Sequence, residues 1–123
     1  MDDIITYIED QPRQQMQIMM LLHSYISSLP NIQAKIRYKI PFYFQNSWIC
    51  YLNPVKGGDV ELAFLRGREL VDEGGLLSAN GRKMVKGVTY QNVEDVSFES
   101  LEPVLLEALI LDENVPYSVK KKK

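Results

Sequence analysis

The feature that most constrains this chain is a segment, 35–44, in which side chains alternate strictly along the sequence. Its even positions carry five apolar or aromatic residues: Ile36, Tyr38, Ile40, Phe42 and Phe44. A period of two is the signature of an extended strand, because successive side chains point to opposite faces of a sheet. Pro41 lacks a backbone donor, which favours an edge, a bulge or a bend at that point. The pattern predicts one continuous strand over 35–44.

Further strands follow after short connections. Residues 48–53 and 60–66 are rich in aromatic and β-branched side chains, and turn-forming residues separate them. A glycine-rich loop over 67–81 precedes a fourth strand at 83–91. Strands joined by connections this short are typical of an antiparallel meander.

Helical periodicity is confined to the two ends of the sequence. A short helix begins near Asp2, and a second helix ends near Ser28 with one apolar stripe along its length. A third helix follows Ser97 and ends near Asn114. The order predicts an α+β fold, with an antiparallel sheet covered on one face by two or three helices. A chain of 123 residues is expected to form a single domain over 1–123.

The charge of the chain and its lack of long apolar runs exclude several classes of protein. Lys and Arg number 14 against 16 Asp and Glu, for a net charge of −2. Four of the lysines, 120–123, belong to a segment, 118–123, that is expected to be a flexible basic tail. The remaining acidic body makes nucleic acid an unlikely partner on whole-chain charge. No apolar run approaches the roughly 20 residues of a membrane span, and no signal peptide is visible, so we expect a cytoplasmic protein.

The single histidine and the single cysteine predict no catalysis. His23 falls on the flank of the helical stripe, without a partner at helical spacing, and is expected to be partly exposed. Cys50 lies in the middle of a predicted strand between large apolar residues, which is typical of a small core residue. One of each excludes an intrachain disulfide and a structural zinc site within one chain. We expect neither an enzyme nor a bound cofactor.

The most distinctive candidate site combines cations with aromatic rings. On a continuous strand, Arg37, Lys39 and Tyr43 share one face, and Trp48 begins the next strand. Arg37 and Lys39 would hold an anion, while Tyr43 and Trp48 would supply flat apolar surface. The sequence predicts a small anionic or aromatic ligand, bound where this strand meets the loop 67–81. The alternative is that the aromatic residues serve only core and edge packing, and the cations a solvated face.

Part of this region resembles a known family. The sequence Lys-Ile-Arg-Tyr-Lys-Ile-Pro-Phe-Tyr at 35–43, after a helix that ends in Leu29-Pro30, is similar to the pattern of the YdhG-like family of bacterial domains of unknown function. The resemblance covers about residues 2–112. It implies a compact α+β domain, often compared with frataxin, and no established activity.

The resemblance leads to a small cytoplasmic binding or adaptor domain, whose partner would be an unknown small molecule or a protein. One alternative is a frataxin-like iron chaperone in iron–sulfur or haem metabolism. Its iron would bind hard oxygen ligands from four carboxylates: Asp2, Asp3, Glu9 and Asp10. A further alternative is a homodimeric interaction domain, so both a monomer and a homodimer are considered.

Overall fold

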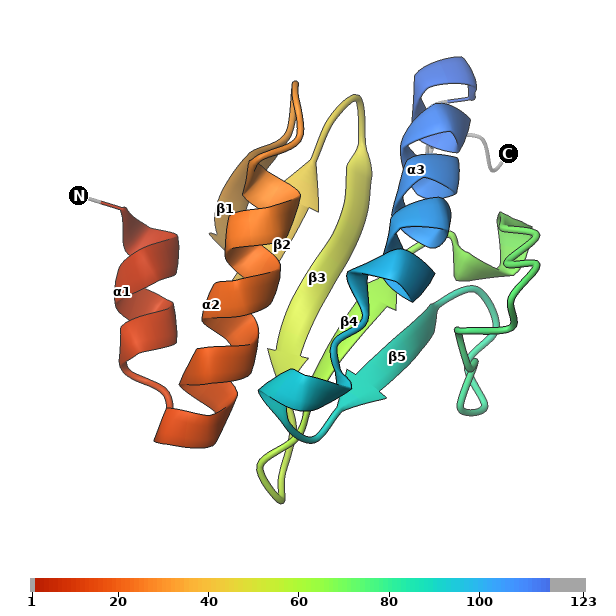
Figure 1. Ribbon diagram of the computed structural model, residues 1–123. Coiled ribbons are helices and arrows are strands. Elements are labelled where there is room, and N and C mark those ends of the chain that lie inside the picture. Colours follow the sequence, from red (N-terminus) through yellow and green to blue (C-terminus); the bar gives the residue numbers. More distant parts are fainter. Residues whose placement is uncertain (1, 116–123) are drawn as a thin grey trace.

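The computed structural model describes residues 2–115, and the predicted basic tail at 118–123 lies outside them. The described chain forms three α-helices, five strands and two short 3-10 turns (Figure 1). In chain order they are α1 (Asp3–Glu9), α2 (Arg13–Ser27), β1 (Gln33–Arg37), β2 (Ile40–Phe44), β3 (Trp48–Pro54), β4 (Val60–Phe64), η1 (Gly67–Glu69), β5 (Lys86–Tyr90), η2 (Val93–Asp95) and α3 (Phe98–Asn114).

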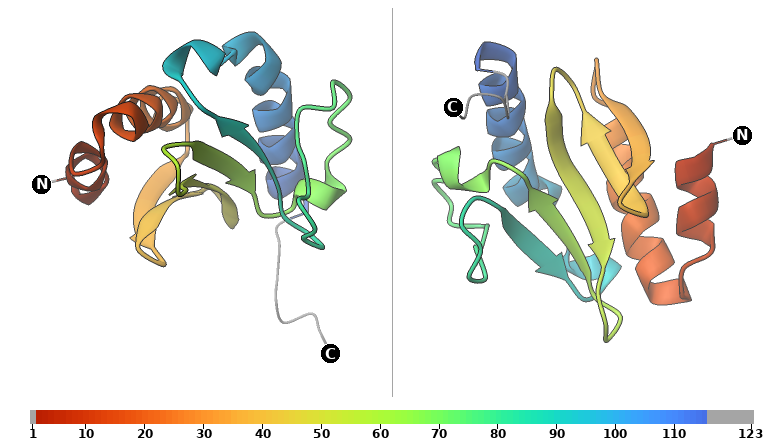
Figure 2. Two further views of the ribbon diagram at one scale, coloured as in Figure 1. Left: turned by 90° about the horizontal axis from the view of Figure 1, so that it is seen from below. Right: turned by 180° about the vertical axis from the view of Figure 1, so that it is seen from behind.

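The strands form one sheet in the order β1-β2-β3-β4-β5, and each neighbouring pair is antiparallel. All three helices lie on the same side of the sheet, and the β1–β2 hairpin bends away from them (Figure 2). The predicted α+β class, the antiparallel meander and the helices at both ends are therefore confirmed. Among residues 2–115, no helix lies on the opposite side of the sheet (Figure 2).

The prediction of one continuous strand over 35–44 is wrong. The chain reverses at Tyr38 and Lys39, whose φ angles are 53° and 67°. A two-residue hairpin turn of type I′ needs positive φ at both central residues, and Asn-Gly is the usual choice. Here two large side chains occupy that strained region, so alternation in the sequence continues across a turn that divides β1 from β2.

Helix ends and the core follow from local sequence. The Asp2 carboxylate accepts a hydrogen bond from the Ile4 backbone N–H at 2.9 Å and caps α1, and Ser97 caps α3. The apolar stripe of α2 is buried against the sheet, as the periodicity predicts. Fully buried side chains of this core come from both layers and include Ile18, Leu22, Ile26, Leu52, Leu62, Leu101 and Leu105.

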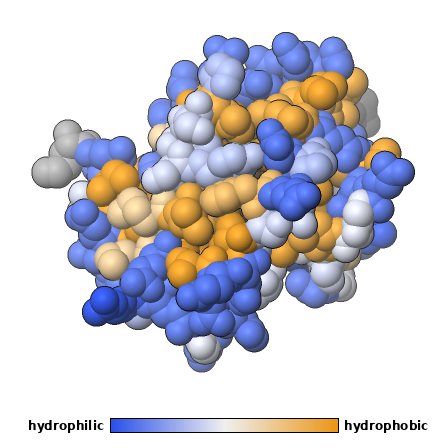
Figure 3. All heavy atoms as spheres, in the orientation of Figure 1, coloured by the Kyte–Doolittle hydropathy of each residue, from blue (hydrophilic) through white to orange (hydrophobic). Residues whose placement is uncertain are grey.

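The outer surface of the helical layer is mixed in character (Figure 3). On α3, Leu106 and Ile110 are 43% and 56% exposed among charged neighbours. Over residues 2–115, no helix combines the length and the apolar character needed to cross a membrane.

Candidate ligand-binding site

The helix-free face of the sheet contains a hollow of about 830 Å³. Drug-sized ligand sites fall in the range of about 300–1,000 Å³. Its floor comes from β2 and β3, and its far wall from the positions where the loop after β4 leaves and rejoins the sheet. The lining is Arg37, Tyr38, Ile40, Phe42, Phe44, Asn46, Ser47, Trp48, Tyr51, Asn53, Leu65, Arg66, Met84 and Val85.

Strand register brings the main side chains of the hollow onto one face. Arg37 pairs with Ile40 across the hairpin, and Phe42 pairs with Tyr51 on the next strand. Paired residues point to the same side of an antiparallel sheet. Trp48 joins them because β3 carries one extra residue, a bulge between the Phe44–Trp48 and Tyr43–Cys50 pairs. Without that bulge, Trp48 would share the buried face with Cys50.

The aromatic rings of the hollow contact one another. Phe42 stacks on Tyr51 with ring centroids 4.9 Å apart and meets the edge of Trp48 at 5.8 Å. Phe44 also meets Trp48 in an edge-to-face arrangement, with ring centroids 5.0 Å apart. These spacings fall in the range where aromatic pairs attract, so the rings form a fixed apolar platform.

Arg37 lies on this platform. Its guanidinium carbon is 4.5 Å from the Trp48 ring centroid, 5.0 Å from that of Tyr38 and 5.3 Å from that of Phe42. Within residues 2–115, its side chain forms no hydrogen bond or ion pair. The rings therefore hold a guanidinium whose five N–H donors are available to a ligand.

The structure brings together two of the four predicted site residues, Arg37 and Trp48. Lys39 is exposed at the hairpin turn, and Tyr43 lies on the opposite face with 0% exposure. A two-residue turn pairs an odd position with an even one, so it moves Tyr43 away from the face of Arg37. The prediction that Tyr43 offers surface to a ligand is corrected for this reason.

Tyr43 instead pairs with His23, which corrects the expectation of a partly exposed histidine. The imidazole is 6% exposed, and its Nδ1 lies 2.8 Å from the Tyr43 hydroxyl oxygen. Sequence spacing along the helix missed this partner because it comes from β2, twenty positions away. The pair is a hydrogen-bonded polar contact inside the core, and burial raises the pKa of Tyr43.

This pair predicts a pH dependence of stability. Burial lowers the pKa of His23 below its ordinary value of 6.5, while the nearby Asp2 carboxylate acts more weakly in the opposite direction. The unfolded chain therefore takes up a proton at a higher pH than the folded chain. Stability should be full above about pH 6.5 and fall below it, by at most about 1.4 kcal/mol per pH unit from this group.

Urea unfolding at several pH values from 8 to 5 measures this dependence, with His23→Gln as the comparison. The variant should be less stable at pH 7.5, and its stability should decline less steeply below pH 6.5. Equal slopes for the two proteins would show that His23 takes up its proton equally in the folded and unfolded states.

The carboxylates of the iron alternative lie at two ends of one helix. Asp2 and Asp3 begin α1, Asp2 already accepts backbone hydrogen bonds there, and Glu9 and Asp10 lie at its other end. No group of three or more His, Cys, Asp or Glu side chains in the described range 2–115 is placed to hold a metal ion. Cys50 is fully buried, as the sequence predicts, and burial raises the pKa of its thiol.

A partly buried ion pair supports the far wall of the hollow. Glu61 on β4 is 7% exposed, and its carboxylate accepts two hydrogen bonds from Arg82, the shorter at 2.6 Å. Arg82 belongs to the segment before β5 and also interacts with the Tyr51 hydroxyl. The pair thus ties the loop to the sheet beside the aromatic platform, and its carboxylate holds the pKa of Arg82 above its ordinary value.

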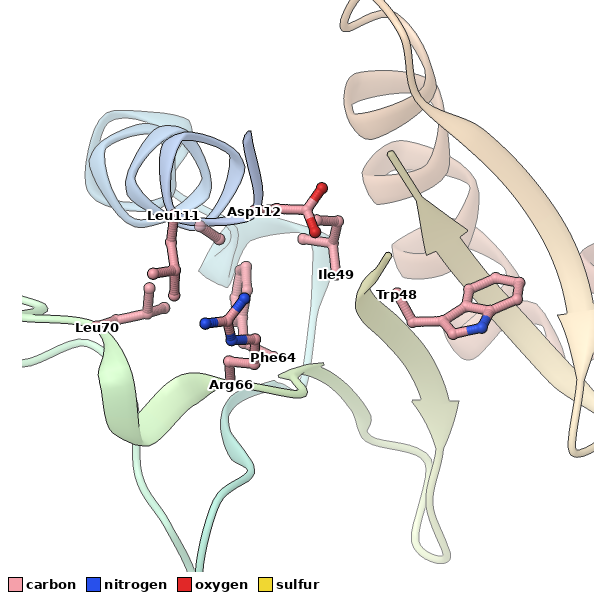
Figure 4. Close-up of a pocket in the computed structure, with 8 residues that line it drawn as sticks. Trp48, Ile49, Phe64, Arg66, Leu70, Leu111 and Asp112 are labelled. Atoms are coloured by element: carbon pink, nitrogen blue, oxygen red, sulfur yellow. The ribbon is translucent and has the colours of Figure 1, made fainter. Parts of the chain in front are cut away.

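Asp112 on α3 anchors the turn that begins β3. Its carboxylate, on a residue 2% exposed, accepts hydrogen bonds from the Asn46 backbone N–H at 2.7 Å and the Gln45 amide at 3.0 Å, and from the Ser47 hydroxyl. Figure 4 shows Asp112 pointing from α3 toward Ile49, while Trp48 extends away on the other side of the strand. The helical layer thus fixes the position from which Trp48 enters the hollow.

The cations and acids of the chain are segregated between the two layers. The sheet segment, residues 29–91, holds nine Lys and Arg against five Asp and Glu, a net charge of +4. The helical segments, residues 2–28 and 92–115, hold eleven acids and one cation, Arg13, a net charge of −10. The whole-chain charge hides this division, and a count by predicted element would have revealed it.

Comparisons with known proteins give no relative for this chain: no protein-family model, no curated protein and no solved structure matches it. The resemblance to the YdhG-like family remains a prediction from the residues at 35–43.

Proposed function

We propose that this chain is a small binding domain, and that the hollow on the helix-free face takes an organic ligand with a planar ring and an anionic group. The proposal rests on the state of Arg37. Its guanidinium carbon lies 4.5 Å from the Trp48 ring centroid, and its side chain has no hydrogen-bond or ion-pair partner within residues 2–115. A carboxylate or phosphate is the group that a guanidinium fork binds best.

The platform lowers the cost of binding. Contacts with three rings restrict Arg37 before a ligand arrives, so less side-chain freedom is lost when the charged hydrogen bonds form. The half-buried Trp48 and Tyr51 rings present flat apolar surface beside the guanidinium. One molecule can therefore stack on a ring and bind the cation at the same time.

The hairpin turn supports a functional reading of this face. Tyr38 and Lys39 both occupy the left-handed region, which costs a non-glycine residue roughly 1–2 kcal/mol. Tyr38 is also 76% exposed, although its ring contacts Arg37 and Phe42. Strained backbone of this kind gathers at ligand sites, where the side chains are needed at that position.

The composition of the lining favours binding over acid–base chemistry. Among the described residues that line the hollow, none is His, Cys, Asp or Glu. General acid–base and nucleophilic catalysis draw chiefly on those side chains. The aromatic and cationic lining supplies recognition instead.

The proposal is tested with 2-naphthoate and its neutral analogue 2-naphthamide, by titration in a calorimeter and by quenching of the only tryptophan, Trp48. We expect the carboxylate to bind about tenfold more tightly than the amide, because only the carboxylate forms charge-assisted bonds with Arg37. Arg37→Ala should remove that preference and leave the affinity for the amide nearly unchanged.

Arg13→Ala is the matched control, since Arg13 is an exposed arginine on α2, in the other layer. It should bind both probes as the native chain does. Equal affinity for carboxylate and amide in the native chain would contradict the proposal. Native mass spectrometry near neutral pH tests the alternative that the hollow is a dimer interface. A native dimer that becomes a monomer in Trp48→Asp would show that a second copy of the chain occupies the hollow.

A further inference from the structure

β1 and the turn after it carry cations and no acidic residue. Arg37 lines the hollow, and Lys35 lies on the same strand outside the lining. No Asp or Glu occurs between Asp10 and Asp59. In that interval, Lys35 and Arg37 lie on β1, and Lys39 lies in the turn that follows. Lys35 pairs with Phe42 and Arg37 with Ile40, so both cations share the face of the aromatic platform.

The spacing of these cations suits a ligand with repeated anionic groups. Residues two apart on a strand are separated by roughly 7 Å. That interval is close to the distance between successive phosphates in an extended single strand, so such a strand can offer one phosphate to Arg37 and the next to Lys35.

We propose that this face binds single-stranded nucleic acid, with the phosphates along β1 and the bases stacked on the rings of β2 and β3. The inference rests on the proposed function, because it places one nucleotide's phosphate at Arg37 and its base at Trp48. Aromatic stacking beside a cationic groove is how proteins bind single strands with little sequence preference. Single strands are favoured over a duplex, whose stacked bases cannot reach the rings.

The negative charge of the helical layer favours binding of a polyanion on the sheet side. The helical segments carry a net charge of −10 and the sheet segment +4. A polyanion is therefore repelled from the helices and drawn toward the sheet. This separation also explains how residues 2–115, with a net charge of −6, can offer a site for nucleic acid.

The test uses a fluorescein-labelled ten-nucleotide uridine strand and fluorescence anisotropy at 50 and 200 mM salt. We expect saturable binding that weakens about tenfold between the two salt concentrations, as for a few phosphate contacts. Lys35→Glu should weaken binding about tenfold or more at 50 mM salt, because Lys35 is exposed and its reversal repels the phosphate it would hold. Lys56→Glu is the control, an exposed lysine in the β3–β4 turn outside the lining of the hollow.

Competition separates this inference from the proposed function. The strand should compete for the hollow with 2-naphthoate, and a ten-base-pair duplex and uridine monophosphate should bind at least tenfold more weakly than the strand. Equal losses for Lys35→Glu and Lys56→Glu would overturn the nucleic-acid proposal. A monophosphate that binds as tightly as the strand would do the same, yet it would leave the planar anionic ligand at Arg37 standing. Failure of 2-naphthoate as well would remove both.

Discussion

Asp112→Ala should lower the free energy of unfolding by about 3 kcal/mol. The substitution removes an acceptor that is 2% exposed and serves the Asn46 backbone N–H, the Gln45 amide and the Ser47 hydroxyl. A buried donor without a partner costs about 1–3 kcal/mol, and water at the turn recovers part of that cost. Because small domains have a total stability of only about 5–15 kcal/mol, the loss should be plain in urea unfolding.

The same substitution should also disturb the hollow. The turn held by Asp112 leads directly into Trp48, so its loosening should shift the tryptophan emission of the folded protein and weaken ligand binding. Glu113→Gln is the matched control, since Glu113 is the exposed neighbour on the same helix and should change stability by less than about 0.5 kcal/mol. Similar losses in the two variants would mean that the carboxylate of Asp112 does not hold the turn.

Gly87→Ala is expected to have the second large effect, about 2 kcal/mol of destabilisation. A Cβ at this position would lie 2.3 Å from Glu61 Oε2 and 2.9 Å from Glu61 Cδ. The Glu61 side chain is buried and accepts a hydrogen bond from Arg82. It must therefore move away from the arginine to make room for the added methyl group. Overpacking of this size costs about 1–3 kcal/mol, and a weakened ion pair adds to it.

Gly74→Ala separates this contact from the general effect of replacing glycine. A Cβ on Gly74 meets nothing within 4 Å, and the backbone there is compatible with alanine. We expect it to be neutral or slightly stabilising in the same urea experiment. Hydrogen exchange should show faster exchange over the loop after β4 in Gly87→Ala only. If exchange there matches the native chain, Glu61 and Arg82 do not hold the loop.

These two variants disturb opposite walls of one site. Asp112 fixes the start of β3, from which Trp48 projects, and the Glu61–Arg82 pair fixes the loop on the far side. Neither Asp112 nor Glu61 lines the hollow. Both residues hold the walls of the hollow in place, so disturbing either should mainly lower the stability of the fold and only secondarily the affinity for a ligand. Arg37→Ala, in contrast, should change the affinity with little change in stability.

Much of the fold was readable from local sequence because it rests on local chemistry. The helical stripe around Ile18 and Leu22 and the cap at Ser97 each depend on neighbours within a few residues. The antiparallel order followed from the short connections. Cys50 was placed in the core for the same reason, since large apolar neighbours on a strand predict burial.

The site was less predictable because it depends on which face a side chain takes. Alternation specifies faces only within one strand, and it cannot show that Tyr38 and Lys39 form a turn that reverses the chain. That turn separates Arg37 from Tyr43, and the bulge in β3 then turns Trp48 toward Arg37. The turn and the bulge together decide which side chains line the hollow. Neither is marked in the sequence by an Asn-Gly pair.

The sequence by itself determined most of the elements, their order and the residues able to form a site, because spacing and composition control these within each segment. Only the tertiary structure decided that His23 meets Tyr43 in the core and that Arg37 lies on Trp48. The physical reason is that these contacts join residues far apart in the chain. Strand register and helix packing determine these contacts, and the local propensity of a segment specifies neither the register nor the packing.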